Sequence, residues 1–177
     1  MKLSRISISR HWQPVLASIA LAGTLLGSVP AQAADVPASS NVPSPVINAD
    51  GVIRIRSAYG VDATVMRLKT AIAAKGIRFF DAIDQAQLGK DAGLTVRKST
   101  LVLFGNPPLG VQFLQANAYA GLDWPVRMLV VEEADGSVWL AWTDFGYIAN
   151  RYHINNRAEQ FKMASEVAGS LAVEAAR

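Results

Sequence analysis

The sequence predicts an α+β fold, with a mainly antiparallel sheet and helices packed on one face of it. Three observations carry this prediction. Residues 52–58 alternate apolar with polar or charged side chains, as a strand with one covered face does. Asp135-Gly136, between two predicted strands, favours a tight hairpin. Apolar residues recur at helical spacing in 61–75 and again in 155–177.

The first 33 residues have the three parts of a secretory signal peptide. Lys2, Arg5 and Arg10 give a basic start, residues 15–29 are apolar, and Ala31-Gln32-Ala33 offers a cleavage site. An uncleaved N-terminal anchor is the alternative interpretation. Residues 34–50 are rich in proline and serine, which favours an extended linker. The sequence therefore predicts a leader over 1–33, a linker over 34–50 and one domain over 51–177, in a periplasmic or secreted protein.

Charge and cysteine content exclude several classes of function. The predicted leader holds three of the 17 basic residues and none of the 14 acidic ones, so the remainder is electrically balanced. We therefore expect no nucleic-acid partner. Nothing resembling a second apolar span follows the leader, so no stable membrane span is expected after cleavage. The chain has no cysteine, which excludes disulfides, thiol nucleophiles and thiolate metal sites.

The first half of the domain is predicted as strand, helix, strand and short helix. In the strand over 52–58, Arg54 and Arg56 project from the face opposite Ile53 and Ile55. A helix over 61–75 follows, with an apolar stripe that comprises Val61, Val65, Leu68 and Ile72. Residues 77–83 then predict a strand, and residues 84–92 one short helix.

The second half begins with a strand over 95–104, whose nearly all-apolar end indicates a central, covered position. Asn106 is placed to cap a helix over 107–116 that opens on Pro107. Strands over 124–133 and 137–143 follow, and then a helix from about 155. Its narrow stripe lies either on the sheet or on a partner's helix, and it comprises Phe161, Ala164, Ala168, Leu171 and Ala175.

Several short motifs fall in an order that resembles domain-of-unknown-function family 302, the TT-1751-like superfamily. The likeness covers about residues 52–154, and its motifs are Phe104-Gly105-Asn106-Pro107, Gly110, Asp123-x-Pro125, Asp135-Gly136 and Trp142-x-Asp144. The resemblance implies a TATA-binding-protein-like topology and a homodimer, and it brings no established activity. Two positions depart from the family pattern: Gln85 replaces a frequent His, and residues 141–145 replace a Tyr-Asn-Asp-Pro element.

Candidate chemistry centres on four polar side chains. Asn106 either binds an oxygen-bearing group or serves only as a helix cap. Asp84 and Asp144 end predicted strands, so they either converge for acid–base work or a hard metal, or cap turns. His153 is the one histidine left after the leader, and it is either a general base or a surface or capping residue.

The aromatic-rich C-terminal half suggests a binding role for some of its rings. Trp142 and Tyr147 lie there, and such rings either fill the core or line a ligand cleft. We therefore predict an exported, non-catalytic domain that binds a small molecule or a partner protein as a dimer. Its predicted ligand-binding residues are Asp84, Asn106, Trp142, Asp144 and Tyr147. The alternative is an enzyme that uses Asp84, Asp144 and His153 near the Asn106 junction. Neither interpretation requires a metal or a cofactor.

Overall fold

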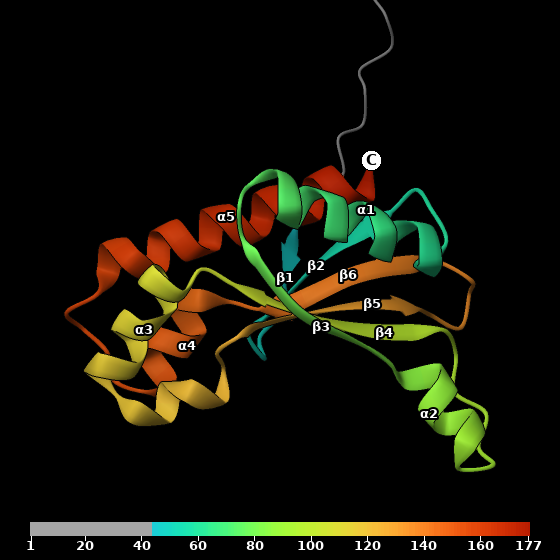
Figure 1. Ribbon diagram of the computed structural model, residues 1–177, viewed down its shortest axis with the longest axis horizontal. Coiled ribbons are helices and arrows are strands. Elements are labelled where there is room, and N and C mark those ends of the chain that lie inside the picture. Colours follow the sequence, from blue (N-terminus) through green and yellow to red (C-terminus); the bar gives the residue numbers. More distant parts are fainter. Residues whose placement is uncertain (1–43) are drawn as a thin grey trace, which may run out of the picture. The chain divides into compact units, whose positions relative to one another are not determined.

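A computed structural model describes residues 44–177, which form one antiparallel sheet of six strands with five α-helices (Figure 1). The strands lie in the order β1-β2-β6-β5-β4-β3, and every neighbouring pair is antiparallel. The predicted α+β class is confirmed. The strands are β1 (Val46–Ile47), β2 (Val52–Ser57), β3 (Arg78–Asp84), β4 (Ser99–Gly105), β5 (Val126–Glu132) and β6 (Val138–Thr143).

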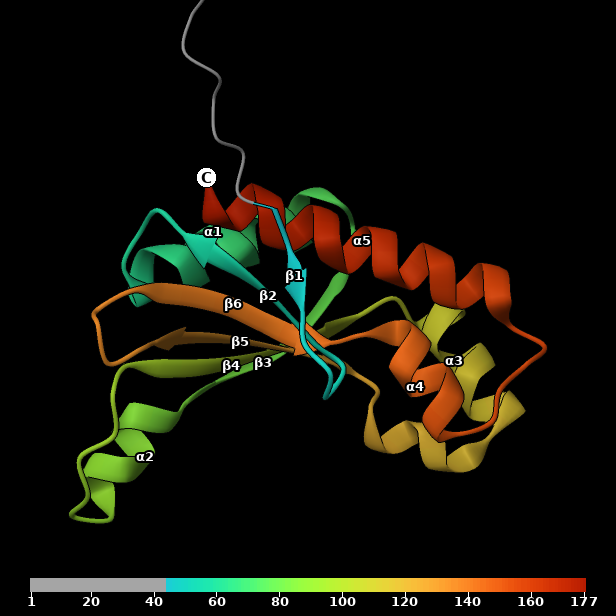
Figure 2. The ribbon, with the colours of Figure 1, turned by 180° about the vertical axis from the view of Figure 1, so that it is seen from behind.

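The two longest helices cover the same face of this sheet. Figures 1 and 2 show α1 and α5 side by side above the strands. The helices are α1 (Val61–Ala74), α2 (Gln85–Asp91), α3 (Pro107–Ala116), α4 (Phe145–Arg151) and α5 (Ala158–Ala176), with a short 3₁₀ helix at Ala118–Leu122. The predicted leader over 1–33 lies outside the described residues. The predicted linker reaches into them, and there β1 pairs with β2 instead of remaining extended and unpaired.

The alternation read from the sequence places the apolar side of β2 correctly, and the structure adds which side of β6 is buried. Ile55, Leu140 and Trp142 are buried beneath the helices, whereas Arg54 and Arg56 are exposed on the other face. The strand β4 differs from the prediction. It pairs on both sides but lies next to the edge strand, and only one of its faces is covered. Its apolar character therefore leaves half-buried side chains on the second face of the sheet.

The C-terminal helix packs within the chain. Phe161 stacks on Phe113 of α3 with ring centroids 4.2 Å apart, and Ala168, Leu171 and Ala175 are buried. Small side chains let α5 approach α1 closely, and Arg67 of α1 donates to backbone carbonyls near the end of α5. Of the two predicted positions for this stripe, contact within the chain is therefore the observed one.

Two elements escaped the sequence interpretation because each is short. The helix α4 is seven residues long and buries only Phe145 and Ile148, too few positions for a helical period to be recognised. The 3₁₀ helix has five residues and buries Ala120. Both lie at the end of the sheet where β4 gives way to α3, and α4 supplies one wall of the cavity there.

Candidate functional site

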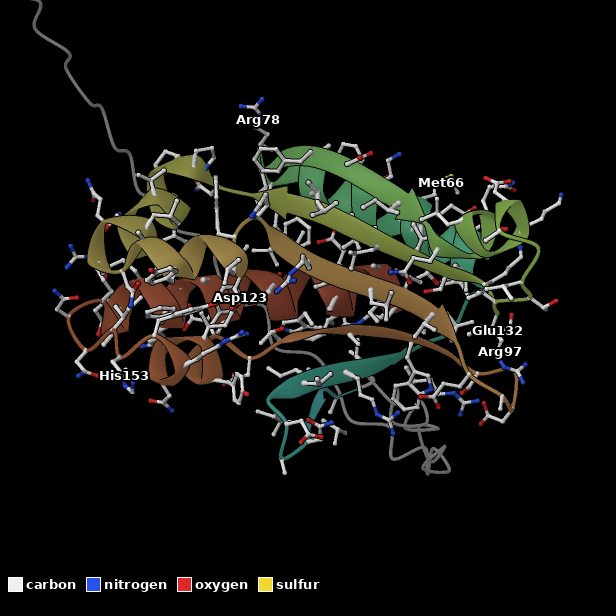
Figure 3. All side chains as sticks on the ribbon, turned by 90° about the horizontal axis from the view of Figure 1, so that it is seen from below. Met66, Arg78, Arg97, Asp123, Glu132 and His153 are labelled. Carbon is white, nitrogen blue, oxygen red and sulfur yellow. The ribbon has the colours of Figure 1, made fainter. Side chains whose placement is uncertain are left out.

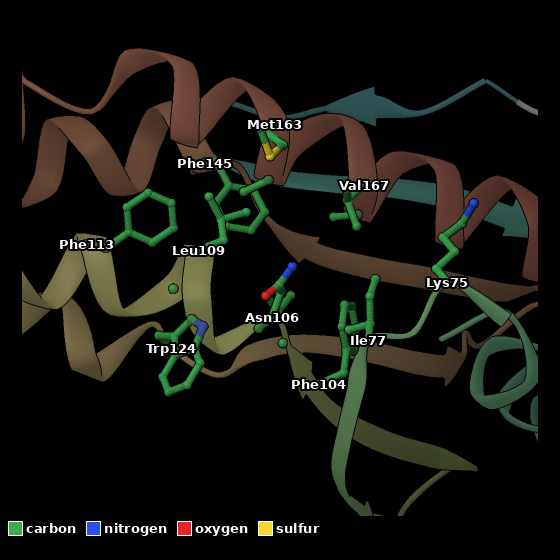
Figure 4. Close-up of a pocket in the computed structure, with 15 residues that line it drawn as sticks. Lys75, Ile77, Phe104, Asn106, Leu109, Phe113, Trp124, Phe145, Met163 and Val167 are labelled. Carbon is green, nitrogen blue, oxygen red and sulfur yellow. The ribbon is translucent and has the colours of Figure 1, made fainter. Parts of the chain in front are cut away.

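A cavity of about 170 Å³ lies where β4 passes into α3, beneath α5 (Figure 4). Most of its walls are apolar and come from elements far apart in the sequence. The lining residues are Lys75, Ile77, Phe104, Gly105, Asn106, Leu109, Gly110, Phe113, Trp124, Val126, Phe145, Met163, Ala164, Val167 and Ala168. Small side chains on α5 and two glycines on the β4–α3 segment leave the space that a larger set of side chains would fill.

The local sequence explains why the chain bends sharply at this cavity. The apolar strand stops at Gly105, and Asn106 keeps an extended conformation with φ −104° and ψ 105°. The prolines at 107 and 108 then open α3, where the missing N–H groups cost no helical hydrogen bond. One turn later, Gly110 lies directly against the indole of Trp124, so that the ring forms part of the cavity wall.

The side chain of Asn106 corrects the predicted helix cap. Asn106 occupies the N-cap position of α3, but its side chain makes no capping hydrogen bond. Its backbone carbonyl instead accepts from the N–H groups of Leu109 and Gly110. The reason is that the prolines at 107 and 108 have no N–H to donate, so the first turn offers the amide few donors. The amide is exposed and lies among the apolar lining residues of Figure 4.

Lys75 is the second polar side chain of the lining. Its ammonium lies 3.7 Å from a carboxylate oxygen of Glu174, and in Figure 4 it points away from Asn106. The aliphatic stem of Lys75 therefore contributes to the wall while its charge faces α5 and solvent. Lys75 already has an acidic neighbour and the indole of Trp124 can only donate, so the amide of Asn106 is the lining group that offers a molecule in the cavity both a donor and an acceptor.

The sheet register does not bring Asp84 beside Asp144. Asp84 pairs with Thr100, which aligns through Val130 with Leu140, four residues before Asp144 on the chain. Strand geometry then separates the two backbones by about 13 Å along the sheet and about 14 Å across it. Each carboxylate caps a helix: Asp84 accepts from the N–H of Gln87 and Asp144 from that of Tyr147. Of the two predicted roles, the observed contacts are those of caps.

The remaining predicted residues lie apart from the cavity lining. His153 is exposed, with φ at 53°, in the turn after α4. Trp142 is buried on the covered face of β6, and its indole N–H has no hydrogen-bond partner among the described residues. Tyr147 is 43% exposed and covers Gly51, whose φ of 72° and lack of a side chain allow the ring to approach. Of the predicted set, the cavity thus includes Asn106.

A buried ionic cluster around Asp123 was missed by the sequence interpretation. The carboxylate of Asp123 accepts hydrogen bonds from Arg127, from Arg151 at 3.3 Å and from the hydroxyl of Tyr152 at 2.6 Å. Its side chain is almost fully buried, whereas both arginines are about half exposed. Asp123 belongs to the Asp123-x-Pro125 motif of the family resemblance. Nothing in the sequence showed that α4 would bring Arg151 and Tyr152 to it. Figure 3 places it at the end of the sheet opposite Arg97 and Glu132.

No cluster of three or more His, Cys, Asp or Glu side chains suited to a metal ion occurs among residues 44–177. Within the same range, no helix combines the length and apolar character needed to cross a membrane.

Comparison with known families identifies the fold. The family model described as "Domain of unknown function DUF302" matches residues 53–171, about two thirds of the chain. The chain belongs to the DUF302 family.

A solved structure shows the same DUF302 architecture. It is the crystal structure of an uncharacterized conserved DUF302 protein from Bacillus stearothermophilus, with a TM-score of 0.65 and 14% sequence identity. The match covers 72% of this chain and 98% of that one. At this level of identity the likeness shows the fold alone.

Curated relatives of this DUF302 chain include proteins named fluoride-specific ion channel FluC 1 from Brucella suis and Brucella abortus, and FluC 2 from Brucella melitensis. Each is 32% identical over 104 residues, which is 59% of this chain. The match covers 41% of the first of them and 38% of the other two. The DUF302 chain thus spans about two fifths of these relatives.

The contact with Asp123 makes the stability of this DUF302 domain sensitive to alkaline pH. The Asp123 carboxylate accepts a hydrogen bond from the hydroxyl of Tyr152, and this raises the pKa of Tyr152 above its ordinary value of 10.0. Burial of the hydroxyl raises the pKa further. The stabilisation is complete below pH 10 and is lost as the pH rises through the folded-state pKa, because the unfolded chain releases the proton first. We expect the free energy of unfolding of wild type to fall faster above pH 10 than that of Tyr152→Phe. Urea titrations from pH 8 to pH 11 measure this, and parallel curves would contradict it.

Proposed function

We propose that this DUF302 domain is an exported, non-catalytic module that binds a small molecule in the cavity beside Asn106. One observation carries the proposal: an apolar cavity whose lining includes an amide side chain that does not cap its helix. Small-molecule sites combine apolar walls with a few polar groups in this way. The uncapped amide costs the fold little at its exposed position, and it leaves a donor and an acceptor available to a ligand.

A cavity-filling variant tests this proposal. Ala164 lies on the α5 wall, so Ala164→Leu places a larger apolar side chain in the cavity. We expect small aromatic compounds to shift the methyl NMR signals of Leu109 and Val167 in wild type, and this response to weaken at least tenfold in Ala164→Leu. Ala158→Leu makes the same change at an exposed position of α5 and serves as the control. Equal responses in both variants would contradict a site in this cavity.

The acid–base enzyme, the second candidate from the sequence, has no observation in its favour. Asp84 and Asp144 are separated by the sheet register and cap different helices. General acid–base catalysis needs both groups within reach of one substrate. We therefore do not assign a reaction to these side chains.

We propose that the domain is a separable unit in its longer relatives. The solved Bacillus stearothermophilus chain consists almost entirely of this fold, so the fold exists there without additional segments. The Brucella proteins named as fluoride channels share only about two fifths of their length with this chain. A binding module joined to a different functional part accounts for both facts, and this module does not need to share the activity in their names.

Export is proposed from the basic start, apolar segment and small-x-small site of the first 33 residues. Expression in a Gram-negative host followed by fractionation tests it. We expect the periplasmic protein to begin at Ala34. An intact N-terminus recovered from the cytosol would contradict export.

We propose that a second copy covers the face of the sheet opposite α1 and α5, seen in Figure 3. This face, called here the uncovered face, carries half-buried Ile83, Leu101, Leu103, Leu129, Val131, Trp139 and Ala141. In Figure 1, α2 projects past the sheet on this side, and its segment exposes Leu88 and Leu94 by 57% and 66%. Apolar surface of this kind on a sheet face and an adjoining arm is typical of an interface between protein chains.

The charges on the uncovered face are complementary to those of a second copy. Arg56 lies at its β2 side and Asp81 at its β3 side, whereas Arg54 and Arg127 on the same face already pair with Glu133 and Asp123 of their own chain. A two-fold axis that lies between two such faces and runs roughly along the strands places the β2 side of one copy over the β3 side of the other. A two-fold axis across the strands would instead place the β2 sides of both copies, and with them the two Arg56 side chains, over one another, so the charges favour the first arrangement.

Charge reversal tests this dimer. We expect Arg56→Asp and Asp81→Arg each to weaken self-association by about fivefold to tenfold, because each places like charges on facing sides of the two copies. The double variant restores the opposite charges in exchanged positions and is expected to recover most of the affinity. Sedimentation equilibrium measures all three proteins beside wild type. A monomeric wild type at high concentration would contradict the dimer, and a double variant no better than the singles would contradict the orientation.

A further inference from the structure

The cavity beside Asn106 also indicates what kind of molecule it takes. We infer that its ligand is a small uncharged compound with an aromatic or similarly compact apolar body and one polar group, a carbonyl, hydroxyl or amide, at the Asn106 end. This inference rests on the proposed function of the cavity and adds the chemical class of the ligand.

The size of the ligand follows from the volume. The cavity measures about 170 Å³. An engineered protein cavity of about 150 Å³ with an apolar lining binds benzene, so a single substituted ring suits the space here. Long acyl chains and fused multi-ring compounds exceed it.

The apolar body of the ligand follows from the walls. Phe104 and Phe113 are buried, and Leu109, Val126 and Val167 complete an aliphatic surround. Trp124 is held in place from both sides, since it packs on Gly110 and meets Phe80 edge to face with centroids 5.9 Å apart. Rigid flat walls favour a flat apolar body, because offset and edge-to-face aromatic contacts then form without rearrangement. Met163, 53% exposed, can adjust its side chain to the ligand.

The absence of charge on the ligand follows from the polar groups at hand. The residues that line the cavity include no carboxylate, so a cationic group would have no counter-charge there. An anionic group would rely on Lys75, whose ammonium already faces Glu174 and points away from the amide. Moving a charge out of water without a partner is costly, whereas one neutral hydrogen-bonding group is matched by Asn106 alone.

Three molecules of nearly equal size and shape test the inference: acetophenone, α-methylstyrene and benzoate. They present at the same position a neutral acceptor, no polar group and an anion. We expect acetophenone to bind in the range of about 0.1–1 mM, which is ordinary for a ligand of this size. We expect α-methylstyrene and benzoate each to bind about tenfold more weakly, the first because it gains no hydrogen bond from the amide and the second because its charge is uncompensated. NMR titration of the full domain, followed at Leu109 and Val167, gives the three dissociation constants.

Asn106→Ala supplies the matched variant. It removes the amide without removing a cap hydrogen bond, so the fold is expected to be retained and its NMR spectrum and melting temperature serve as the check. We expect this variant to bind acetophenone about tenfold more weakly and α-methylstyrene within about twofold of wild type.

The outcomes separate the ligand class from the site itself. Tighter binding of benzoate than of acetophenone, abolished by Ala164→Leu, would overturn the uncharged class while leaving the site in place. Equal affinities for acetophenone and α-methylstyrene would overturn the polar anchor at Asn106. If none of the three compounds gives a response that Ala164→Leu removes, the proposed site is itself wrong.

Discussion

Gly110→Ala is expected to destabilise the domain by about 2–3 kcal/mol, although alanine is the better helix former. In an isolated helix this change would gain about 1 kcal/mol. Here a Cβ on Gly110 would overlap the indole of Trp124 far inside van der Waals contact. The ring cannot simply move away, because Phe80 meets it from the side and Gly105 lies against it. Overpacking of this kind typically costs 1–3 kcal/mol or somewhat more, which exceeds the gain in helix propensity.

Gly169→Ala is the matched control for that change. Gly169 lies within α5, and a Cβ there would meet no atom within 4 Å. We expect this variant to be more stable than wild type by about 0.5–1 kcal/mol, from helix propensity alone. Urea unfolding of both variants measures the difference. If Gly110→Ala is as stable as Gly169→Ala, the close packing of Trp124 on α3 is wrong, and with it one wall of the cavity.

Asp123→Ala is expected to cost about 3 kcal/mol in the free energy of unfolding. The change leaves the buried hydroxyl of Tyr152 without its acceptor and removes the charge that holds Arg127 and Arg151. Hydrogen bonds to charged groups contribute about 1.5–3 kcal/mol, and an orphaned buried donor adds its desolvation cost. Because both arginines are about half exposed and regain water, the loss stays below that of a fully buried ion pair.

Asp123→Asn and Asp62→Ala bracket this expectation. Asp123→Asn keeps an oxygen that accepts from Tyr152, so it is expected to lose about half as much as the alanine variant. Asp62 forms a 2.6 Å ion pair with Lys98, but both side chains are largely exposed. Removing such a surface pair costs far less than removing a buried charge, because water and salt screen the attraction. Chemical denaturation of the three variants orders them, and an Asp123→Ala loss no larger than that of Asp62→Ala would contradict a structural role for the cluster.

The sequence interpretation succeeded where one local rule decides the structure. Alternation on β2 placed Ile55 on the apolar side opposite Arg54 and Arg56, and the Asp135-Gly136 turn joined β5 to β6 as expected. Capping carboxylates also follow a local rule, and Asp84 and Asp144 both cap the helices that begin after them. Asn106 failed as a cap because the two prolines that open α3 remove donors, a conflict between two local rules at neighbouring positions.

The candidate site was visible from the sequence only in part. The β4–α3 junction was singled out, and its Asn106 does line a cavity. The other walls come from α4, α5 and the segment after α1, and no spacing along the chain relates them. The separation of Asp84 from Asp144 was equally hidden, because it depends on which strands become neighbours.

The sequence by itself determined most of the strands and longer helices, the apolar side of β2, α1 and α5, and the family. Hydrophobic period, turn residues and the caps Asp84 and Asp144 act within a few residues, so they can be read without knowing the fold. Strand order, the cavity volume, the Asp123 cluster and the uncovered face of the sheet were decided by tertiary structure alone. Each depends on packing between segments distant in the chain. The same packing decides which side chains surround the amide of Asn106.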